Sequence, residues 1–530
     1  MSNDSERNHI WHADIKRRIL LQRVLTGAAV LPGLDLLTRG SGVLAYAHAR
    51  ATLPSKATGT LRVANPGEPN FIDPADALEI TEFGPIRNVY GGLVNWDPTY
   101  TKLIPDLATS WKSNPDATEW TFMLRSGVTF HDGTPFDSTA ARKTIEYYKG
   151  KTWGLVWANL VKIDDSNPQV LRVFFSKPAP DLARDQSLVR MISPKLIAAK
   201  AVAKQMVGTG PYRFKAWNKG QSIILEANPS YWDKGHPFIQ EIQFLTIADK
   251  TAAVNALKAG DVDVIMKVDP KQLQALAKDP RFGVASNRSW LQGWLFFKWN
   301  LTPTNDVRVR QAIAYAVDLP TITKEVMLGQ AKPAPSPLPY GTYGWVNPPT
   351  RYPYNPTKAR ALLKAAGYGS GLSLKMGSQA GVLILGDEVS QAVVGQLSEV
   401  GINVKLDIME PGLLATEIAS NHATHHLFHA EFGWVDGSEF HFTVGNALSY
   451  TSATTKQLQK IQAIVDKTTT TPDGSQRLQY LAALQNEFMQ ELPYLPMYDA
   501  TLSDVFQANI KGYSNPRDGY LPYFGNAYRV

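Results

Sequence analysis

Residues 208–232 read GTGPYRFKAWNKGQSIILEANPSYW, and this stretch carries the clearest local pattern in the chain. The two glycines and the proline at its start are typical of a tight turn, in which glycine supplies a positive φ. Two strand-like runs follow at 212–217 and 222–226, and the Asn-Lys-Gly at 218–220 predicts a β-hairpin between them. A second break at 228–230 ends the hairpin. None of these side chains indicates a chemical reaction, so the residues by themselves predict a scaffold element.

The composition is that of a folded protein with several domains. A chain of 530 residues exceeds what one hydrophobic core supports and corresponds to roughly three domains. Its 44% hydrophobic and 19% charged residues exclude a disordered chain. The net charge of +7 comes from scattered Lys and Arg without a run of five or six like charges, so we expect no nucleic-acid partner. The absence of cysteine excludes disulfides, thiol catalysis and a lipid-anchored cysteine.

The first 49 residues have the order of a secretory signal peptide. A basic block at 16–18 precedes an apolar run around 27–31, and small residues follow at 45–49. The paired arginines of this block, followed by x-Leu-Leu, predict export of the twin-arginine type. The apolar run is too short and too polar to span a bilayer. We therefore expect cleavage after Ala49 and a mature protein in the periplasm.

Strands and helices alternate along the rest of the chain. A strand at 241–247, a helix at 250–259 and a strand at 262–266 have the pattern of a short βαβ unit. The proline-rich stretch 331–356 cannot be regular for long, and its aromatic residues indicate an ordered surface loop. Further strands are expected at 60–64, 119–124, 170–175, 372–376, 403–408 and 426–433, and further helices at 85–93, 138–149, 307–317, 356–366, 387–400, 413–420, 455–467 and 475–492. This alternation predicts an α/β protein of several lobes.

Several segments, in a fixed order over nearly the whole mature chain, carry a resemblance to a known family. They are PNFIDPADA, VYGGLV, LIPDLATSW, EWTFMLRSGVTFHDGTPF, GTGPY with NPSYW, ALKAGDVDV, DVRVRQAIAYAVD, YNPTKARALLKAAGY and ELPYLPMYD. The chain resembles the extracytoplasmic solute-binding proteins of peptide-type ABC importers, which include dipeptide-, oligopeptide- and nickel-binding proteins.

The resemblance implies a two-lobed α/β periplasmic binding protein of the Venus-flytrap type, with an extra subdomain in the first lobe. Its hinge would consist of two crossover strands near 296–300 and 496–500, and the lobes would close around a ligand. The expected organisation is a signal peptide (1–49), a first segment of lobe I (50–96), an extra subdomain of lobe I (97–204), a second segment of lobe I (205–298), lobe II (299–498) and a C-terminal return to lobe I (499–530).

The expected function is that of a monomeric, non-enzymatic transport component. It would bind a peptide in the interlobe cleft, without a cofactor or a metal, and deliver it to an inner-membrane permease with its ATPases. No HExxH, Walker A or GxSxG motif is present, which agrees with a protein that performs no catalysis.

The resemblance also places the ligand contacts. An acidic residue after Gly-Trp commonly binds a peptide's amino terminus in this family, as a charge-assisted hydrogen bond. The expected contacts are Ile80, Thr81, Trp290, Trp294, Trp434, Asp436, Glu439 and Tyr498. The chain departs from the family in two places: VDGSEFHF after Gly-Trp is shorter than usual, and 377–388, around Gln379, lacks the arginine that grips a dipeptide's carboxylate.

These departures keep other ligands open. An opine, an oligosaccharide or a similar solute is the main alternative, and nickel or haem is a weaker one. His422, His425, His426 and His429 would share one face of a helix and could bind a metal there. The surrounding sequence is typical of a strand, in which His426 and His429 face opposite sides, so we expect surface or core histidines.

Overall fold

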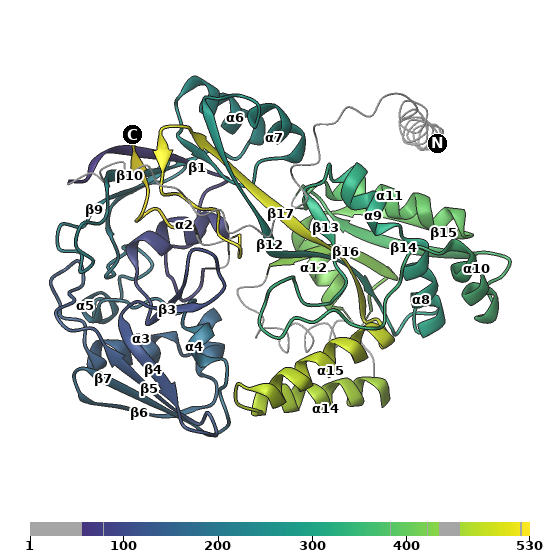
Figure 1. The fold of residues 1–530 in the computed structure, drawn as a ribbon, viewed down its shortest axis with the longest axis horizontal. Coiled ribbons are helices and arrows are strands. Elements are labelled where there is room, and N and C mark those ends of the chain that lie inside the picture. Colours follow the sequence, from purple (N-terminus) through teal and green to yellow (C-terminus); the bar gives the residue numbers. More distant parts are fainter. Residues whose placement is uncertain (1–55, 78, 382, 421, 434–455, 520–521) are drawn as a thin grey trace. The chain divides into compact units, whose positions relative to one another are not determined.

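The computed structural model describes residues 56–77, 79–381, 383–420, 422–433, 456–519 and 522–530. The expected signal peptide (1–49) lies outside the described residues, as do Trp434, Asp436 and Glu439. Within the described residues, the fold is mixed α/β, as the alternation of elements predicted. The strands β12 and β17 run together through the middle of the main sheet, and helices lie along both ends of it (Figure 1).

The main sheet has the order β15-β14-β16-β12-β17-β11-β1-β10-β9-β8, and β13 pairs with β17 beside it. A second sheet has the order β4-β5-β7-β6, and two small ones pair β2 with β3 and β18 with β19. The strands are β1 (Thr58–Asn65), β2 (Val94–Trp96), β3 (Leu103–Pro105), β4 (Ala108–Ser113), β5 (Glu119–Leu124), β6 (Leu160–Asn167), β7 (Val170–Phe175), β8 (Tyr212–Asn218), β9 (Ser222–Ala227), β10 (Ile239–Thr246), β11 (Val264–Ile265), β12 (Phe282–Phe297), β13 (Ala331–Pro333), β14 (Leu372–Gln379), β15 (Ile402–Met409), β16 (Leu427–Gly433), β17 (Tyr494–Gln507), β18 (Ile510–Lys511) and β19 (Tyr528–Arg529).

The helices flank these sheets (Figure 1). They are α2 (Ile80–Val89), α3 (Ser138–Tyr148), α4 (Leu182–Asp185), α5 (Pro194–Ala198), α6 (Lys250–Ala259), α7 (Pro270–Leu276), α8 (Val307–Ala316), α9 (Leu319–Thr321), α10 (Pro356–Ala365), α11 (Gly386–Glu399), α12 (Pro411–Ala419), α14 (Lys456–Thr470) and α15 (Ser475–Glu491). The expected βαβ unit is confirmed, because β10 and β11 both pair in parallel with β1 and α6 connects them. The proline-rich stretch 331–356 is an ordered loop after the short β13, as expected.

The predicted hairpin is present as β8 and β9 at one edge of the main sheet. Gly220 in its turn has a φ of +73°. Gly208 and Gly210 were expected to need a positive φ, and this was wrong. A Cβ at these positions would lie 2.3 and 2.7 Å from the Val89 carbonyl oxygen, so glycine is required there for close backbone approach to the end of α2.

The helix expected at 85–93 instead spans Ile80–Val89, with Pro85 inside it. It begins early because Glu79 and Glu82 form a reciprocal capping box at its start. Pro85 has no N–H to donate to the carbonyl four residues earlier, at Thr81. The Asn65 side-chain amide donates to that Thr81 oxygen at 3.0 Å. The Thr81 carbonyl therefore still has a hydrogen-bond donor, and the helix continues past the proline.

Most buried apolar side chains of the described residues belong to two large hydrophobic clusters. The first core contains apolar residues of β1, α2, β5, α3, β7 to β10 and the segment after β17. The second core contains those of the second half of β12, of α8, α10, α11, β14 to β16, α14 and α15, and of the first half of β17. Each of these cores is a sheet layer covered by helices. β12 and β17 run from the second core to a third, smaller cluster formed with β11, α6 and α7, where Phe506 of β17 also packs against the first core.

The pairing of β12 with β17 changes register where the strand passes from one core to the other. Residues 282–288 pair with 501–507, and 292–296 pair with 494–499, with an irregularity between Arg288 and Gln292. The expected domain boundaries, including the one at 298, stay predictions. The register shift lies several residues before that boundary.

Candidate functional site

The site is built around Gly293 on β12. Gly293 lies opposite Glu431 of β16 on one side and Tyr498 of β17 on the other. A Cβ on Gly293 would lie 2.2 Å from the Tyr498 ring, so the missing side chain is what allows the tyrosine to cross over β12. From there the Tyr498 hydroxyl donates a hydrogen bond of 2.8 Å to Glu431 Oε1.

The Glu431 carboxylate has neutral hydrogen-bond donors. Besides Tyr498, the backbone N–H of Ile384 donates to it, at 3.2 Å from Oε1 and 3.4 Å from Oε2. Ile384 belongs to the stretch 377–388, where the sequence lacks the arginine of dipeptide-binding relatives. Burial raises the pKa of Glu431 to about 7, and these hydrogen bonds oppose that rise only partially. The carboxyl group is therefore poised to gain or lose a proton near neutral pH.

A buried polar chain continues from this carboxylate into the second core. His429 Nε2 lies 3.1 Å from the Tyr498 hydroxyl, and its Nδ1 lies 2.8 Å from Ser390 Oγ, which donates to Ser378 Oγ. Burial lowers the pKa of His429 to about 3, so the imidazole is neutral at physiological pH. The chain orients Tyr498 without adding a charge beside Glu431.

Positive charge reaches the site from the side of the first core. Lys250 and Lys267 line a small cavity of about 40 Å³ between β11 and α6, and both stabilise the ionised form of Glu431. Lys267 has a φ of +50°, an uncommon conformation for a residue with a side chain, and its N–H donates to Asp504 Oδ1 at 2.9 Å. Burial lowers the pKa of Lys267, while Glu431 and Asp504 oppose that shift. The site thus combines a carboxylate from one core with an ammonium from the other.

Three of the expected ligand contacts lie in or next to this site. Tyr498 belongs to it directly, although its ring is fully buried. Ile80 and Thr81 are the first residues of α2 and are partly exposed. They follow Glu79, whose charge acts on Lys267. Their contact with a ligand stays a prediction.

The two tryptophans of β12 are placed differently. Trp294 has no exposed surface and stacks on Tyr494 in the second core, with 4.1 Å between the ring centroids. A ligand could reach it only if that packing opened. Trp290 is 1% exposed and packs edge-on against Trp96 and Tyr100 at 5.6 and 5.7 Å. Both of these partners line a cavity of about 220 Å³. Trp290 is therefore the better placed of the two.

Glu431 is the residue that the sequence pattern did not single out. The expected acidic contacts, Asp436 and Glu439, were placed after Gly433-Trp434, where the family usually has them. Glu431 stands two residues before Gly433 in the same strand. A signal existed: a glutamate in an apolar strand needs a specific partner, because an unpaired buried charge is costly.

The four histidines are strand or loop residues and do not share a helical face. His429 lies within β16, as the strand prediction expected, whereas His426 precedes the strand, which begins one residue later than predicted. His425 Nε2 lies 3.1 Å from the Asp407 carboxylate. Among the residues that the structure describes, no group of three or more His, Cys, Asp or Glu side chains is arranged to bind a metal ion.

Comparison with known proteins decides the family. The model of the bacterial extracellular solute-binding proteins, family 5 (middle), matches residues 102–449. The chain belongs to this family. It is the substrate-binding component of an ABC importer and not an enzyme, as the sequence predicted. Across the residues described, no helix is both long enough and apolar enough to cross a membrane.

Its relatives include glutathione-binding proteins. The chain is 30% identical to glutathione-binding protein GsiB of Pectobacterium atrosepticum over 358 residues, which are 66% of this chain and 68% of that protein. It is 26% identical to its counterpart in Escherichia coli K12 over 498 residues, which are 89% of this chain and 96% of that one.

Solved structures confirm the two-lobed periplasmic binding protein fold. A periplasmic binding protein of Helicobacter pylori in complex with the peptide STSA matches with a TM-score of 0.74 and 22% identity, over 90% of this chain and 99% of that chain. The substrate-binding protein CtaP of Listeria monocytogenes matches with a TM-score of 0.81 and 20% identity, over 89% and 100%. A binding protein of A. tumefaciens in complex with agropinic acid matches with a TM-score of 0.72 and 24% identity, over 89% and 99%.

Proposed function

We propose that this protein is a monomeric periplasmic receptor that binds small peptides between its lobes and delivers them to an inner-membrane permease. Glutathione-like tripeptides are the first ligands to test, since curated relatives of this chain are glutathione-binding proteins. The periplasmic location rests on the signal-peptide pattern of residues 1–49 together with the extracellular family.

The observation that carries the peptide proposal is the Glu431 carboxylate. Its hydrogen-bond donors are the neutral Tyr498 hydroxyl and the Ile384 amide, and burial raises its pKa to about 7. A peptide's ammonium group next to it would supply the charge-assisted bond that such a carboxylate lacks. Lys267, on the side of the first core, would face the ligand's carboxylate. A zwitterionic peptide therefore matches the charges of the site.

This arrangement gives peptide binding a pH dependence with a defined sign. The ligand ammonium interacts with ionised Glu431, and that form becomes dominant above pH 7. Lys250 and Lys267 favour the same ionised form, whereas His429 stays neutral across this range. Ionisation of Glu431 alone would raise the affinity for a free-amino peptide about tenfold between pH 6 and pH 8. Because an α-amino group has lost about half of its protons by pH 8, the expected net rise is about fivefold.

Isothermal titration calorimetry of the purified protein tests the proposal. We expect glutathione or trialanine to bind, N-acetyl-trialanine to bind at least about tenfold more weakly, and Glu431→Gln to remove most of that difference. Glu146→Gln is the matched control, since Glu146 forms an exposed pair with Arg142 on α3. The peptide proposal fails if no di- to pentapeptide binds, and the role of Glu431 fails if free and acetylated peptides bind equally.

An opine is the second candidate ligand. The stretch 377–388 has no arginine to fix a dipeptide's carboxylate, and one structural neighbour contains agropinic acid. Agropinic acid therefore belongs in the same titration. Binding of this compound without binding of any peptide would replace the peptide by an opine in the same role.

A further inference from the structure

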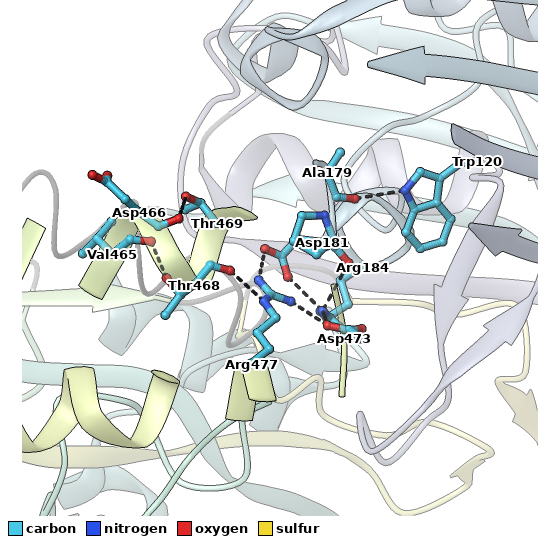
Figure 2. A network of polar contacts seen from close by, with 11 residues as sticks. Trp120, Ala179, Asp181, Arg184, Val465, Asp466, Thr468, Thr469, Asp473 and Arg477 are labelled. Carbon is cyan, nitrogen blue, oxygen red and sulfur yellow. Dashed lines mark hydrogen bonds and ion pairs between the residues drawn. The ribbon is translucent and has the colours of Figure 1, made fainter. Parts of the chain in front are cut away.

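Four charged side chains form a closed ring between two distant segments of the chain. Asp181 and Arg184 stand at α4, and Asp473 and Arg477 stand at the start of α15 (Figure 2). Arg184 binds both oxygens of Asp473 at 2.8 Å, and Arg477 Nη2 donates to Asp181 Oδ2. Within each segment, Arg184 donates to Asp181 at 2.8 Å and Arg477 donates to Asp473 at 2.6 Å. Arginine and aspartate alternate around the ring.

Each half of the ring is attached to a different hydrophobic core. Leu182 and Ala183 of α4 belong to the first core, and the Trp120 indole on β5 donates to the Ala179 carbonyl just before them, at 3.0 Å (Figure 2). Leu481 and Leu484 of α15 belong to the second core. Arg477 also donates to the Thr468 carbonyl near the end of α14, at 2.8 Å. The ring therefore joins the two cores through α4 and α15, separately from the pairing of β12 with β17.

The ring is largely shielded from water, with one edge open. The side chains of Arg477, Asp181 and Arg184 are 1%, 8% and 9% exposed, whereas that of Asp473 is 42% exposed. The guanidinium carbon of Arg184 lies 4.1 Å from the centre of the Tyr343 ring, in the proline-rich loop. Burial alone would raise the pKa of Asp473, but Arg184 and Arg477 outweigh it and keep the carboxyl group ionised.

The way in which the charges are distributed distinguishes this ring from a permanent contact. Each segment carries one arginine and one aspartate that already pair with each other, at spacings of three and four residues. If the segments separate, every charge keeps a partner on its own segment and regains water. Separation would therefore break the two crossing contacts without leaving a buried charge unpaired, which is the usual cost of opening a buried ion pair.

We propose that the Asp181–Arg184–Asp473–Arg477 ring is a reversible latch that holds the two lobes closed at the side opposite the shared strands. It acts whatever the ligand is, and so it stands independently of the peptide proposal. When the lobes open, each segment reverts to its own neutral pair; when they close, the pairs merge into the ring. The latch sets how much of the ligand-free protein is already closed, which in turn scales the apparent affinity for any ligand.

The closed fraction of the ligand-free protein tests this proposal. Because the chain has no cysteine, Asp116→Cys on the β4–β5 turn and Lys364→Cys on α10 allow specific double labelling. Distances between the two labels are then measured by pulsed electron paramagnetic resonance at 20 and 500 mM NaCl. In the parent, we expect salt to shift the distribution toward longer distances, because the open edge at Asp473 admits ions.

Asp473→Asn is the decisive variant, since it weakens the Arg184 crossing contact at the exposed corner and keeps the shape of the side chain. We expect a ratio of open to closed molecules about five- to tenfold higher than in the parent at 20 mM NaCl, and little further response to salt. Asp279→Asn, which removes a local exposed pair with Arg281, is the control and should leave the distribution unchanged. If Asp473→Asn keeps the parent distribution at both salt concentrations while lowering Tm, the ring is a fixed contact and the latch proposal is wrong.

Discussion

The ion-pair ring and the Glu431 site both contain shielded carboxylates, Asp181 in the ring and Glu431 in the site. The surroundings shift carboxyl pKa values in opposite directions in the two regions. In the ring, Asp473 lies between two guanidinium groups that keep its pKa below the ordinary value. At Glu431, the hydrogen-bond donors are a hydroxyl and an amide, and burial raises the pKa to about 7. Each carboxylate of the ring accepts hydrogen bonds from two guanidinium groups, whereas the positive charges of Lys250 and Lys267 only partially offset the effect of burial on Glu431. This difference is why we propose the ring as a closing contact and Glu431 as a ligand contact.

The largest loss of stability is expected when an arginine of the ring is removed. Arg477→Met should lower the free energy of unfolding by about 3–5 kcal/mol, because Asp181 is left buried without its second partner. Urea titration measures this loss. Arg308→Met, at an exposed pair with Asp306, is the control and should lower the free energy of unfolding far less. A loss of similar size in both variants would mean that the ring has no special role.

Gly293→Ala tests the Glu431 site by disturbing the packing of Tyr498 over β12. The added methyl group would meet the Tyr498 ring, and displacing it should cost about 3 kcal/mol and remove the hydroxyl donor of Glu431. Thermal unfolding and peptide titration report the two effects. Gly395→Ala on α11 is the matched control, because a Cβ there has open space and should stabilise the helix by about 0.5–1 kcal/mol. Unchanged binding in Gly293→Ala would exclude Tyr498 from the site.

The raised pKa of Glu431 also predicts how stability changes with pH. Because the folded state binds this proton more tightly than the unfolded state does, the stabilisation from protonated Glu431 is complete below pH 4.5 and is lost as pH rises through about 7. Glu431→Gln should remove that loss, so the variant should gain about 2 kcal/mol over the parent between pH 5 and pH 8. Urea titrations at both pH values measure the gain. A constant difference between variant and parent would show that Glu431 is ionised throughout.

The smallest effect is expected at an ion pair between α7, which packs in the small third cluster, and α11 of the second core. Lys271 of α7 and Glu388 of α11 form a single pair of 2.6 Å, with side chains 63% and 39% exposed. Lys271→Ala should therefore change stability by less than about 1 kcal/mol and leave the closed fraction nearly unchanged. Urea titration and the label distances measure both. If Lys271→Ala changes the closed fraction more than Asp473→Asn does, the Lys271–Glu388 pair, and not the ring, holds the protein closed.

The sequence predicted the local elements better than the long-range contacts. The hairpin at β8 and β9 and the helix α6 follow from turn residues and periodicity, which act over a few positions. The start of α2 was misplaced because the helix contains Pro85, and the hydrogen bond that compensates for this proline comes from Asn65 on a different strand. Such a partner cannot be read from the helix itself.

The candidate site was only partially predictable. Tyr498 was expected from the resemblance, and its position beside the Glu431 carboxylate depends on Gly293 in a strand more than 200 residues away. Glu431 was missed because its role depends on the residues that surround it in space. The ring was missed for the same reason, since Asp181 and Arg477 are 296 residues apart and neither belongs to a recognisable motif.

The pairing of β12 with β17 determines when, during synthesis, the chain can finish folding. The two strands are interior members of the main sheet, and β17 begins at residue 494 of 530. The second core thus lacks an internal strand until nearly the whole chain has been synthesised, and contacts of such high sequence separation form slowly. A truncation before residue 494 would remove the middle of the sheet and leave two open edges. Whatever the extent of their movement when a ligand binds, the parts of the chain on either side of β12 and β17 complete their folding together.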